Sequence, residues 1–241
     1  MSIYRKFVSL IGKNQTIKKM LIHLFPSRYE KYVSEPQQQV KKAFIEHGIE
    51  ALRVFHDCME KNNHPYTLAF GSILGAVREK GLIKHDFDLD TFMWIEDFSD
   101  KVIKDLIACG FKWINNYSID SGKYGREDTF EYKGARIDVF YLYPAINKYP
   151  YCNIFVPIKD NDPEDRRMPR RVEIPVSKKR VLVPFENTEA YIPENAEEFC
   201  ILRYGPNYMT PDPDWDWANS GNHMIWEEMI PLTTHNANPQ I

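Results

Sequence analysis

Residues 86–94 read Asp86-Phe-Asp-Leu-Asp-Thr-Phe-Met-Trp94, so acidic and apolar side chains alternate before the run becomes wholly apolar. A period of two predicts a β-strand that presents Asp86, Asp88 and Asp90 on one face. Three carboxylates at this spacing raise one another's pKa unless a cation neutralises them, and ligands made only of oxygen suit Mg²⁺ or Mn²⁺. The stretch therefore predicts a divalent metal site. The alternative, a solvent-facing strand edge, is disfavoured by the apolar second half of the run.

A short apolar run over residues 66–70 leads into a Gly-Ser pair a little before this strand. We expect a strand, a turn at Gly71-Ser72 and then a short helix over residues 73–80. A hydroxyl and free backbone N–H groups at the start of a helix form a natural phosphate seat, so Gly71 and Ser72 are predicted to hold phosphate. Arg78, on the same helix, is predicted either to neutralise that phosphate or to form a surface or structural salt bridge.

A further acid, Asp138, lies inside an apolar run and should point to the opposite face from its two apolar neighbours. A lone carboxylate in such a strand is costly unless it shares a metal ion or takes a proton from a hydroxyl group. We therefore predict that Asp138 joins Asp88 and Asp90 at the metal, as third ligand or as base. The alternative is an ion pair with Arg136 or Arg126.

The remaining sequence mixes helical and strand patterns. Helices are predicted over 38–63, 98–109 and 195–204, the last with Asn195 as N-cap and Gly205 at its end. Strands are predicted over 111–117, 129–132 and 135–143, with a hairpin turn at Lys133-Gly134. After Pro144, prolines punctuate short runs, which predicts loops and short strands. Together these patterns predict an α/β (α+β) fold: one mixed sheet flanked by helices, with a Pro-rich C-terminal elaboration.

Composition limits the class of protein. At 241 residues one domain, residues 34–241, is expected, and the net charge of -3 argues against a nucleic-acid partner. No stretch approaches the roughly 20 apolar residues of a membrane span, so a cytoplasmic location is expected. The four cysteines have no CxxC spacing and are predicted to be buried reduced thiols, neither a zinc site nor a disulfide framework: Cys58, Cys109, Cys152 and Cys200.

The N-terminal segment, residues 1–33, is basic and amphipathic. Lysine and arginine side chains alternate there with apolar ones, and the first acidic residue is Glu30. Such a segment is typical of peripheral contact with an anionic membrane surface, here the inner membrane face. The alternative is a helix that packs its apolar side on the domain.

Two motifs together resemble a known family. Residues 70–78 read Phe-Gly-Ser-Ile-Leu-Gly-Ala-Val-Arg, and residues 81–90 read Gly-Leu-Ile-Lys-His-Asp-Phe-Asp-Leu-Asp. They resemble the signature of the LicD family, bacterial phosphocholine transferases related to the fukutin-type transferases of the nucleotidyltransferase-fold superfamily. Residues 136–140 and 192–209 resemble further segments of that family.

The resemblance has two departures. Phe87 replaces the family's usual middle acid and should point away from the metal, so we expect the site to remain intact. His85 stands where a tryptophan is usual, either near the head group of the donor or as a partly exposed loop histidine.

The resemblance implies a nucleotidyltransferase-like fold and transfer of a phosphorylated alcohol, such as phosphocholine or a polyol phosphate. The donor would be a CDP-alcohol, the acceptor a hydroxyl of a glycan or glycolipid, and the released product CMP. We expect Asp88 and Asp90 to be the principal metal ligands, with Asp86 in support. The residues themselves support only a divalent ion that bridges a diphosphate. The rival readings are a nucleotidyltransferase that releases pyrophosphate and an inactive relative that binds a nucleotide or glycan.

Two weaker clusters lie in the second half. Basic residues gather between Arg166 and Arg180, either as a solvated face or as a lid over an anionic substrate. Acidic residues alternate over 212–216 beside Trp215 and Trp217, which indicates a loop or an aromatic platform for an acceptor sugar.

Overall fold

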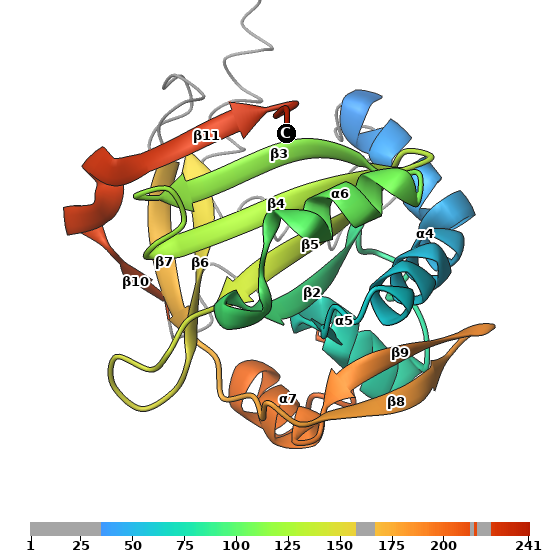
Figure 1. Ribbon diagram of the computed structural model, residues 1–241. Coiled ribbons are helices and arrows are strands. Elements are labelled where there is room, and N and C mark those ends of the chain that lie inside the picture. The colour runs from blue at the N-terminus through green and yellow to red at the C-terminus, as the bar shows by residue number, and fades with distance from the viewer. Residues whose placement is uncertain (1–34, 158–166, 213–214, 216–222) are drawn as a thin grey trace, which may run out of the picture. The chain divides into compact units, whose positions relative to one another are not determined.

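The computed structural model describes residues 35–157, 167–212, 215 and 223–241 (Figure 1). Contacts divide the chain into two units, Met1–Gln39 and Val40–Ile241, and the elements below belong to the second unit except for the start of the first helix. The N-terminal segment 1–33 and its predicted membrane contact lie outside the described residues. Among the described helices, none is both long enough and apolar enough to cross a lipid bilayer.

Six strands form the main sheet. Their order is β1 (Thr67–Leu68), β2 (Asp88–Trp94), β5 (Ala135–Leu142), β4 (Gly125–Tyr132), β3 (Lys112–Ile119) and β11 (Thr233–Ala237). β2 and β5 run parallel, whereas every other neighbouring pair is antiparallel. The predicted mixed sheet is therefore confirmed. The predicted hairpin turn is confirmed as well: Lys133 and Gly134 have φ angles of 51° and 85°, as a type I′ turn requires.

Helices pack on both faces of this sheet. They are α4 (Glu35–Lys61), α5 (Phe70–Leu74), α6 (Asp100–Ala108) and α7 (Ala196–Tyr204), with a π-helical turn η2 (Gly75–Glu79) and 3₁₀ turns η3 (Ile95–Asp97) and η4 (Glu227–Leu232). Figure 1 shows α6 lying across β4 and β5, on the face to which Tyr141 points. On the opposite face Phe70 of α5 contacts Phe92 and Phe140. Phe199 of α7 contacts Phe92 on that face.

The Pro-rich part after Pro144 holds short strands, as predicted. β6 (Tyr151–Pro157), β7 (Arg167–Glu173) and β10 (His223–Ile225) form a second sheet, and β8 (Arg180–Phe185) pairs with β9 (Thr188–Pro193) as a hairpin. β11 had no sequence signal, because an edge strand needs no apolar alternation and its sequence is Thr-Thr-His-Asn-Ala.

Helix α7 is fixed at its start by Asn195. This residue occupies the N-cap position as predicted, but its side chain makes no cap hydrogen bond. Instead its Oδ1 accepts the N–H of Ser177 at 2.7 Å, and its Nδ2 donates to the carbonyl of Pro175 at 2.9 Å. The amide therefore ties the beginning of α7 to the segment that follows β7.

The prediction of four reduced cysteines is wrong for one pair. Cys58 of α4 and Cys109 at the end of α6 form a disulfide, with their Cα atoms 6.3 Å apart. Cys152 and Cys200 are free and buried, as expected. The paired residues are separated by 51 positions, so no local spacing could indicate the bond. Only the packing of α6 beside α4 brings them together.

A buried carboxylate organises the α6 face of the sheet. Asp128 on β4 has no exposed surface and accepts hydrogen bonds from Nε1 of Trp113 at 2.9 Å and Nδ2 of Asn116 at 2.8 Å. It also accepts from the Tyr141 hydroxyl at 2.9 Å and from Nε of Arg126 at 2.6 Å. Both charges of the Arg126–Asp128 pair are thus compensated, which a buried pair requires.

Replacing Asp128 should destabilise the fold strongly. Asp128→Ala leaves Arg126 partly buried without its partner, so we expect the free energy of unfolding to fall by about 3–5 kcal/mol. Urea unfolding followed by far-UV circular dichroism measures the change. The control is Asp57→Ala, an exposed acid of α4, which should lie within about 0.5 kcal/mol of the unchanged protein. Equal stability of the two variants would contradict this account of the network.

Candidate metal and phosphate site

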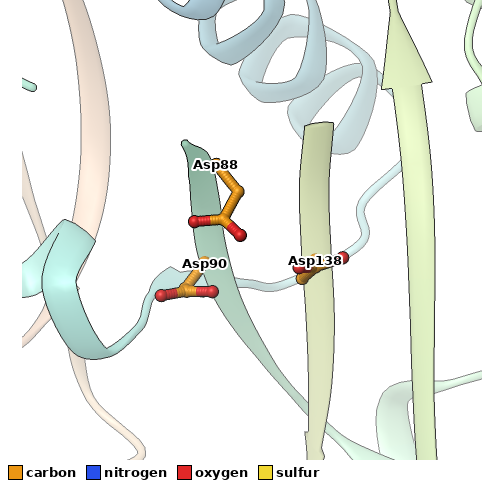
Figure 2. Close-up of side chains that lie close together, drawn as sticks. All are labelled: Asp88, Asp90 and Asp138. Carbon is orange, nitrogen blue, oxygen red and sulfur yellow. The ribbon is translucent and has the colours of Figure 1, made fainter. Parts of the chain in front are cut away.

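Three carboxylates meet on the α5 face of the main sheet. Asp88 and Asp90 extend from β2, and Asp138 extends from the neighbouring β5 (Figure 2). Asp90 lies directly opposite Asp138 in the parallel register, and a ligand oxygen from each of the three residues lies within 4.8 Å of the others. The strand register therefore brings Asp138, predicted as a lone acid in an apolar strand, beside two of the three acids predicted from alternate positions.

Burial and mutual repulsion make this cluster electrostatically costly. Burial, and then the charge of Asp88, raises the pKa of Asp138 to about 7. The same two causes raise the pKa of Asp90 well above its usual range. Burial also raises the pKa of Asp88, while the nearby Arg136 opposes that change. Close carboxylates in a buried place need a cation or protons to neutralise them.

The donor set fits a divalent cation. It consists only of carboxylate oxygens, which suits Mg²⁺ or Mn²⁺ better than zinc. Oδ1 of Asp138 is buried and has no hydrogen-bond partner among the described residues, so it is free to act as a ligand. A buried oxygen without a partner is costly in a folded protein unless something binds it.

Asp86 does not share the strand with the other two acids. β2 begins at Asp88, so the prediction that all three side chains project from one strand is wrong for Asp86. Asp86 lies in the preceding turn, where a Cβ added to Gly71 would come within 3.0 Å of its Oδ2. Burial, and then the charge of Asp88, raises the pKa of Asp86 to about 7, while Arg78 opposes that shift. Asp86 is therefore a neighbour of the cluster, and its side chain fits beside Gly71 because that residue has no Cβ atom.

The Gly-Ser pair belongs to the first turn of a helix. We expected the helix to start at Ile73, but α5 starts at Phe70, so Gly71 and Ser72 lie inside its first turn. The Ser72 hydroxyl is buried and accepts the N–H of Asp90 at 2.9 Å. This hydrogen bond holds α5 against the metal-ligand strand. Backbone N–H groups in a first helical turn have no partner within the helix, so they can still face an anion.

Arg78 has a protein partner. Its Nε lies 2.7 Å from a carboxylate oxygen of Glu79, and its NH1 donates to the carbonyl of Tyr208 at 3.2 Å. The structure thus contains the salt bridge that was the alternative for this residue, although the charge of Arg78 also acts on Asp86. The ion pairs considered for Asp138 are not formed among the described residues: Arg126 pairs with Asp128 and Arg136 with no carboxylate.

Sequence reasoning missed one buried acid beside the cluster. Glu127 of β4 lies opposite Phe140 of β5, on the same sheet face as Asp138. Its Oε2 accepts the N–H of Phe155 on β6 at 3.4 Å, and burial, followed by the charge of Asp138, raises its pKa well above the usual range. Extending the strand predicted over 129–132 by two residues would have placed Glu127 on this face.

The weaker sequence clusters have ordinary partners where they are described. Lys178 pairs with Glu96, and Arg180 pairs with Glu60 at 3.1 Å, as expected for a solvated face. Trp215 packs on Tyr204 with ring centroids 4.9 Å apart. Further members of the two clusters lie outside the described residues: Arg166, Asp214, Asp216 and Trp217.

The two departures from the LicD signature can also be placed. The His85 side chain is 78% exposed in the turn before β2, as a loop histidine would be. The Phe87 side chain is exposed and has the ammonium group of Lys41 5.6 Å from its ring centroid.

Comparison with known proteins shows the family of this chain. Residues 63–195, just over half of the chain, match the family model for the LicD/FKTN/FKRP nucleotidyltransferase domain. An uncharacterized protein of Rickettsia prowazekii is 32% identical over 139 residues, and one of Rickettsia typhi is 30% identical over 153 residues. These alignments cover 55% and 52% of this chain and 48% of each relative, so the chain matches about half the length of these relatives. The protein that carries the Asp88, Asp90 and Asp138 cluster belongs to the LicD/FKTN/FKRP nucleotidyltransferase-domain family.

Proposed function

We propose that this protein transfers a phosphorylated alcohol from a CDP-activated donor to a hydroxyl group of a cell-surface glycan or glycolipid, with release of CMP. The observation that carries the proposal is the half-buried cluster of Asp88, Asp90 and Asp138, which lies within the segment that matches the family. Membership of a transferase family gives the general reaction class. The donor and the acceptor are our proposal.

Asp88, Asp90 and Asp138 would hold Mg²⁺ or Mn²⁺ through their carboxylate oxygens. A divalent ion bound there supplies positive charge to a diphosphate and stabilises the negative charge that develops during phosphoryl transfer. We assign Asp138 to the ligand set because its Oδ1 is buried without a partner. The alternative role, base for the acceptor hydroxyl, makes a different prediction for Asp138→Asn: Mn²⁺ binding would survive while turnover is lost.

The first turn of α5 would position the donor. Gly71 and Ser72 would present their backbone N–H groups to the donor, and the bond from the Asp90 N–H to the Ser72 hydroxyl supports this placement by tying the turn to the metal-ligand strand. Arg78 would add positive charge on the Asp86 side, since its charge already acts on that carboxylate. These residues would bind and orient the diphosphate, and orientation accounts for much of the catalysis of phosphoryl transfer.

We also propose that the basic residues of segment 1–29 hold the enzyme at the anionic inner membrane face, near a lipid-linked acceptor. Sedimentation with anionic liposomes compares the full chain with a chain that lacks residues 1–29. We expect the full chain to sediment and the shortened chain to stay in the supernatant. Equal sedimentation of the two would contradict the proposal.

Relief of repulsion should give the metal cluster a distinct thermal signature. In EDTA, Asp90→Asn replaces a carboxyl group whose ionised form is disfavoured by burial and by the neighbouring carboxylates, so we expect its melting temperature to rise by about 2–4 °C for each kcal/mol of unfavourable interaction removed. Added Mg²⁺ or Mn²⁺ should raise the melting temperature of the unchanged protein through ligand linkage but leave Asp90→Asn unaffected.

The control for this experiment is Asp57→Asn on the exposed side of α4. Its melting temperature in EDTA should equal that of the unchanged protein, and added metal should raise both melting temperatures by the same amount. A metal-induced increase that persists in Asp90→Asn would place the ion elsewhere.

Product analysis tests the reaction. The purified protein is incubated with a panel of CDP-alcohols and nucleoside triphosphates, with and without Mg²⁺ or Mn²⁺, and the released nucleotide is identified. We expect CMP only when both a metal and one CDP-alcohol are present. Asp88→Ala should lower turnover at least about a hundredfold while the fold is kept, because charge stabilisation at the transferring group is lost. Pyrophosphate released from a triphosphate would identify a nucleotidyltransferase, and metal-independent nucleotide binding without turnover would identify an inactive relative.

A further inference from the structure

Arg203 lies in the last turn of α7 and is held by aromatic side chains. Its guanidinium carbon is 5.5 Å from the ring centroid of Phe70 and 5.7 Å from that of Trp215. Its NH1 and NH2 atoms lie 3.4 and 3.5 Å from Nε2 of His223. Rings on two sides leave the guanidinium few alternative orientations, which is the kind of preorganisation that lowers the entropic cost of binding.

This arginine forms no ion pair within the part of the chain that the structure describes, although the charge of Asp90 acts on it. No carboxylate lies within 4.0 Å of it, and its Nε is buried without a hydrogen-bond partner. Two other shielded arginines have acidic partners, since Arg126 has Asp128 and Arg78 has Glu79. Arg136 resembles Arg203, because its Nε is also buried without a hydrogen-bond partner among the described residues, but it lies directly opposite Asp88. A cation that is shielded from water and has no paired anion destabilises the folded protein. Binding of an anion from outside the described chain would remove this cost at Arg203.

Arg203 stands beside the acid cluster. The ring of Phe70 on which it rests also contacts Phe92 and Phe140, which follow Asp90 and Asp138 by two residues on the same sheet face. In Figure 1, α7 lies next to α5, whose first residue is Phe70. The guanidinium therefore approaches the cluster from the α7 side, next to Asp90.

A second arginine near the cluster, Arg136, already offsets part of the negative charge of the carboxylates. Arg136 of β5 lies directly opposite Asp88 in the register, and its charge acts on both Asp88 and Asp138. Three carboxylates (-3), one divalent ion (+2) and Arg136 (+1) together carry about no net charge, so the cluster alone offers little positive charge to an incoming diphosphate. Arg203 is in a position to supply positive charge beside Asp90, in addition to Arg78 on the Asp86 side.

We propose that Arg203 binds the diphosphate of the donor, holding its phosphate oxygens from the α7 side while the acid cluster faces them from β2 and β5. The inference rests on the proposed function, because it takes the donor to be a diphosphate ester. A planar guanidinium that can make two parallel N–H···O bonds suits phosphate better than the point charge of a lysine does. Arg203 is thereby a substrate-binding residue outside the Gly-Ser and acid motifs.

Binding of inorganic pyrophosphate tests the inference. Isothermal titration calorimetry with and without Mg²⁺ compares the unchanged protein, Arg203→Gln and the control Arg53→Gln, an exposed arginine of α4. Loss of a charge-assisted contact should weaken binding by Arg203→Gln about tenfold or more, whereas Arg53→Gln should bind as the unchanged protein does. Mn²⁺ affinity, followed by electron paramagnetic resonance, should be the same in all three.

Two results would overturn the inference. One is an Arg203→Gln variant that binds pyrophosphate as tightly as the unchanged protein; the other is an unchanged protein that does not bind pyrophosphate at all. Should Arg203→Gln fail to fold, Arg203→Lys is compared with the unchanged protein in its place. Weaker pyrophosphate binding by Arg203→Lys would support the inference, and equal binding would contradict it. Absence of Mn²⁺ binding in the unchanged protein would instead count against the metal-dependent proposal, and the titrations without metal would still decide the role of Arg203.

Discussion

The parallel pairing of β2 with β5 is the constraint on which the site depends. Its register places Asp90 opposite Asp138, and the same alternation turns Leu89 and Ile137 into the core on the other face. A slip of one residue would expose the apolar residues and bury the acids on the wrong side, so the hydrophobic core fixes the position of the carboxylates. The fold thus holds like charges together at a cost that the core offsets.

The two faces of the main sheet differ in whether their buried charged groups have partners. On the α6 face, Asp128 accepts hydrogen bonds from four side chains and its charge is matched by Arg126. On the α5 face, Asp138 has a buried oxygen without a partner and Arg203 has no carboxylate within 4.0 Å among the described residues. Unmatched groups of both signs on one face are expected where a cation and an anion bind together, and they reduce the stability of the protein without its ligands.

Sequence reasoning located the metal strand but not its limits. Asp86 was predicted inside the strand, whereas β2 starts at Asp88, because its partner β5 begins at Ala135 directly after the hairpin turn. The start of α5 was predicted three residues late, at Ile73. The Gly-Ser pair suggested that the strand continues to Phe70, but β1 ends at Leu68 and Ala69 is already the N-cap of the helix. Its N–H donates to Asp90, and its carbonyl already accepts the N–H of Ile73. Strand and helix ends depend on partners that a local pattern does not contain.

The sequence by itself determined the mixed fold and the alternating acids Asp88 and Asp90 on one strand, because each rests on side-chain periodicity within a few residues. Asp138 could be assigned as well, since a lone acid in an apolar strand is costly. Only the tertiary structure decided the pairing of Cys58 with Cys109, the place of Glu127 beside the cluster and the lack of an ion pair for Arg203 among the described residues. Each of these depends on contacts between segments far apart in the chain, and register and packing determine which of those segments meet.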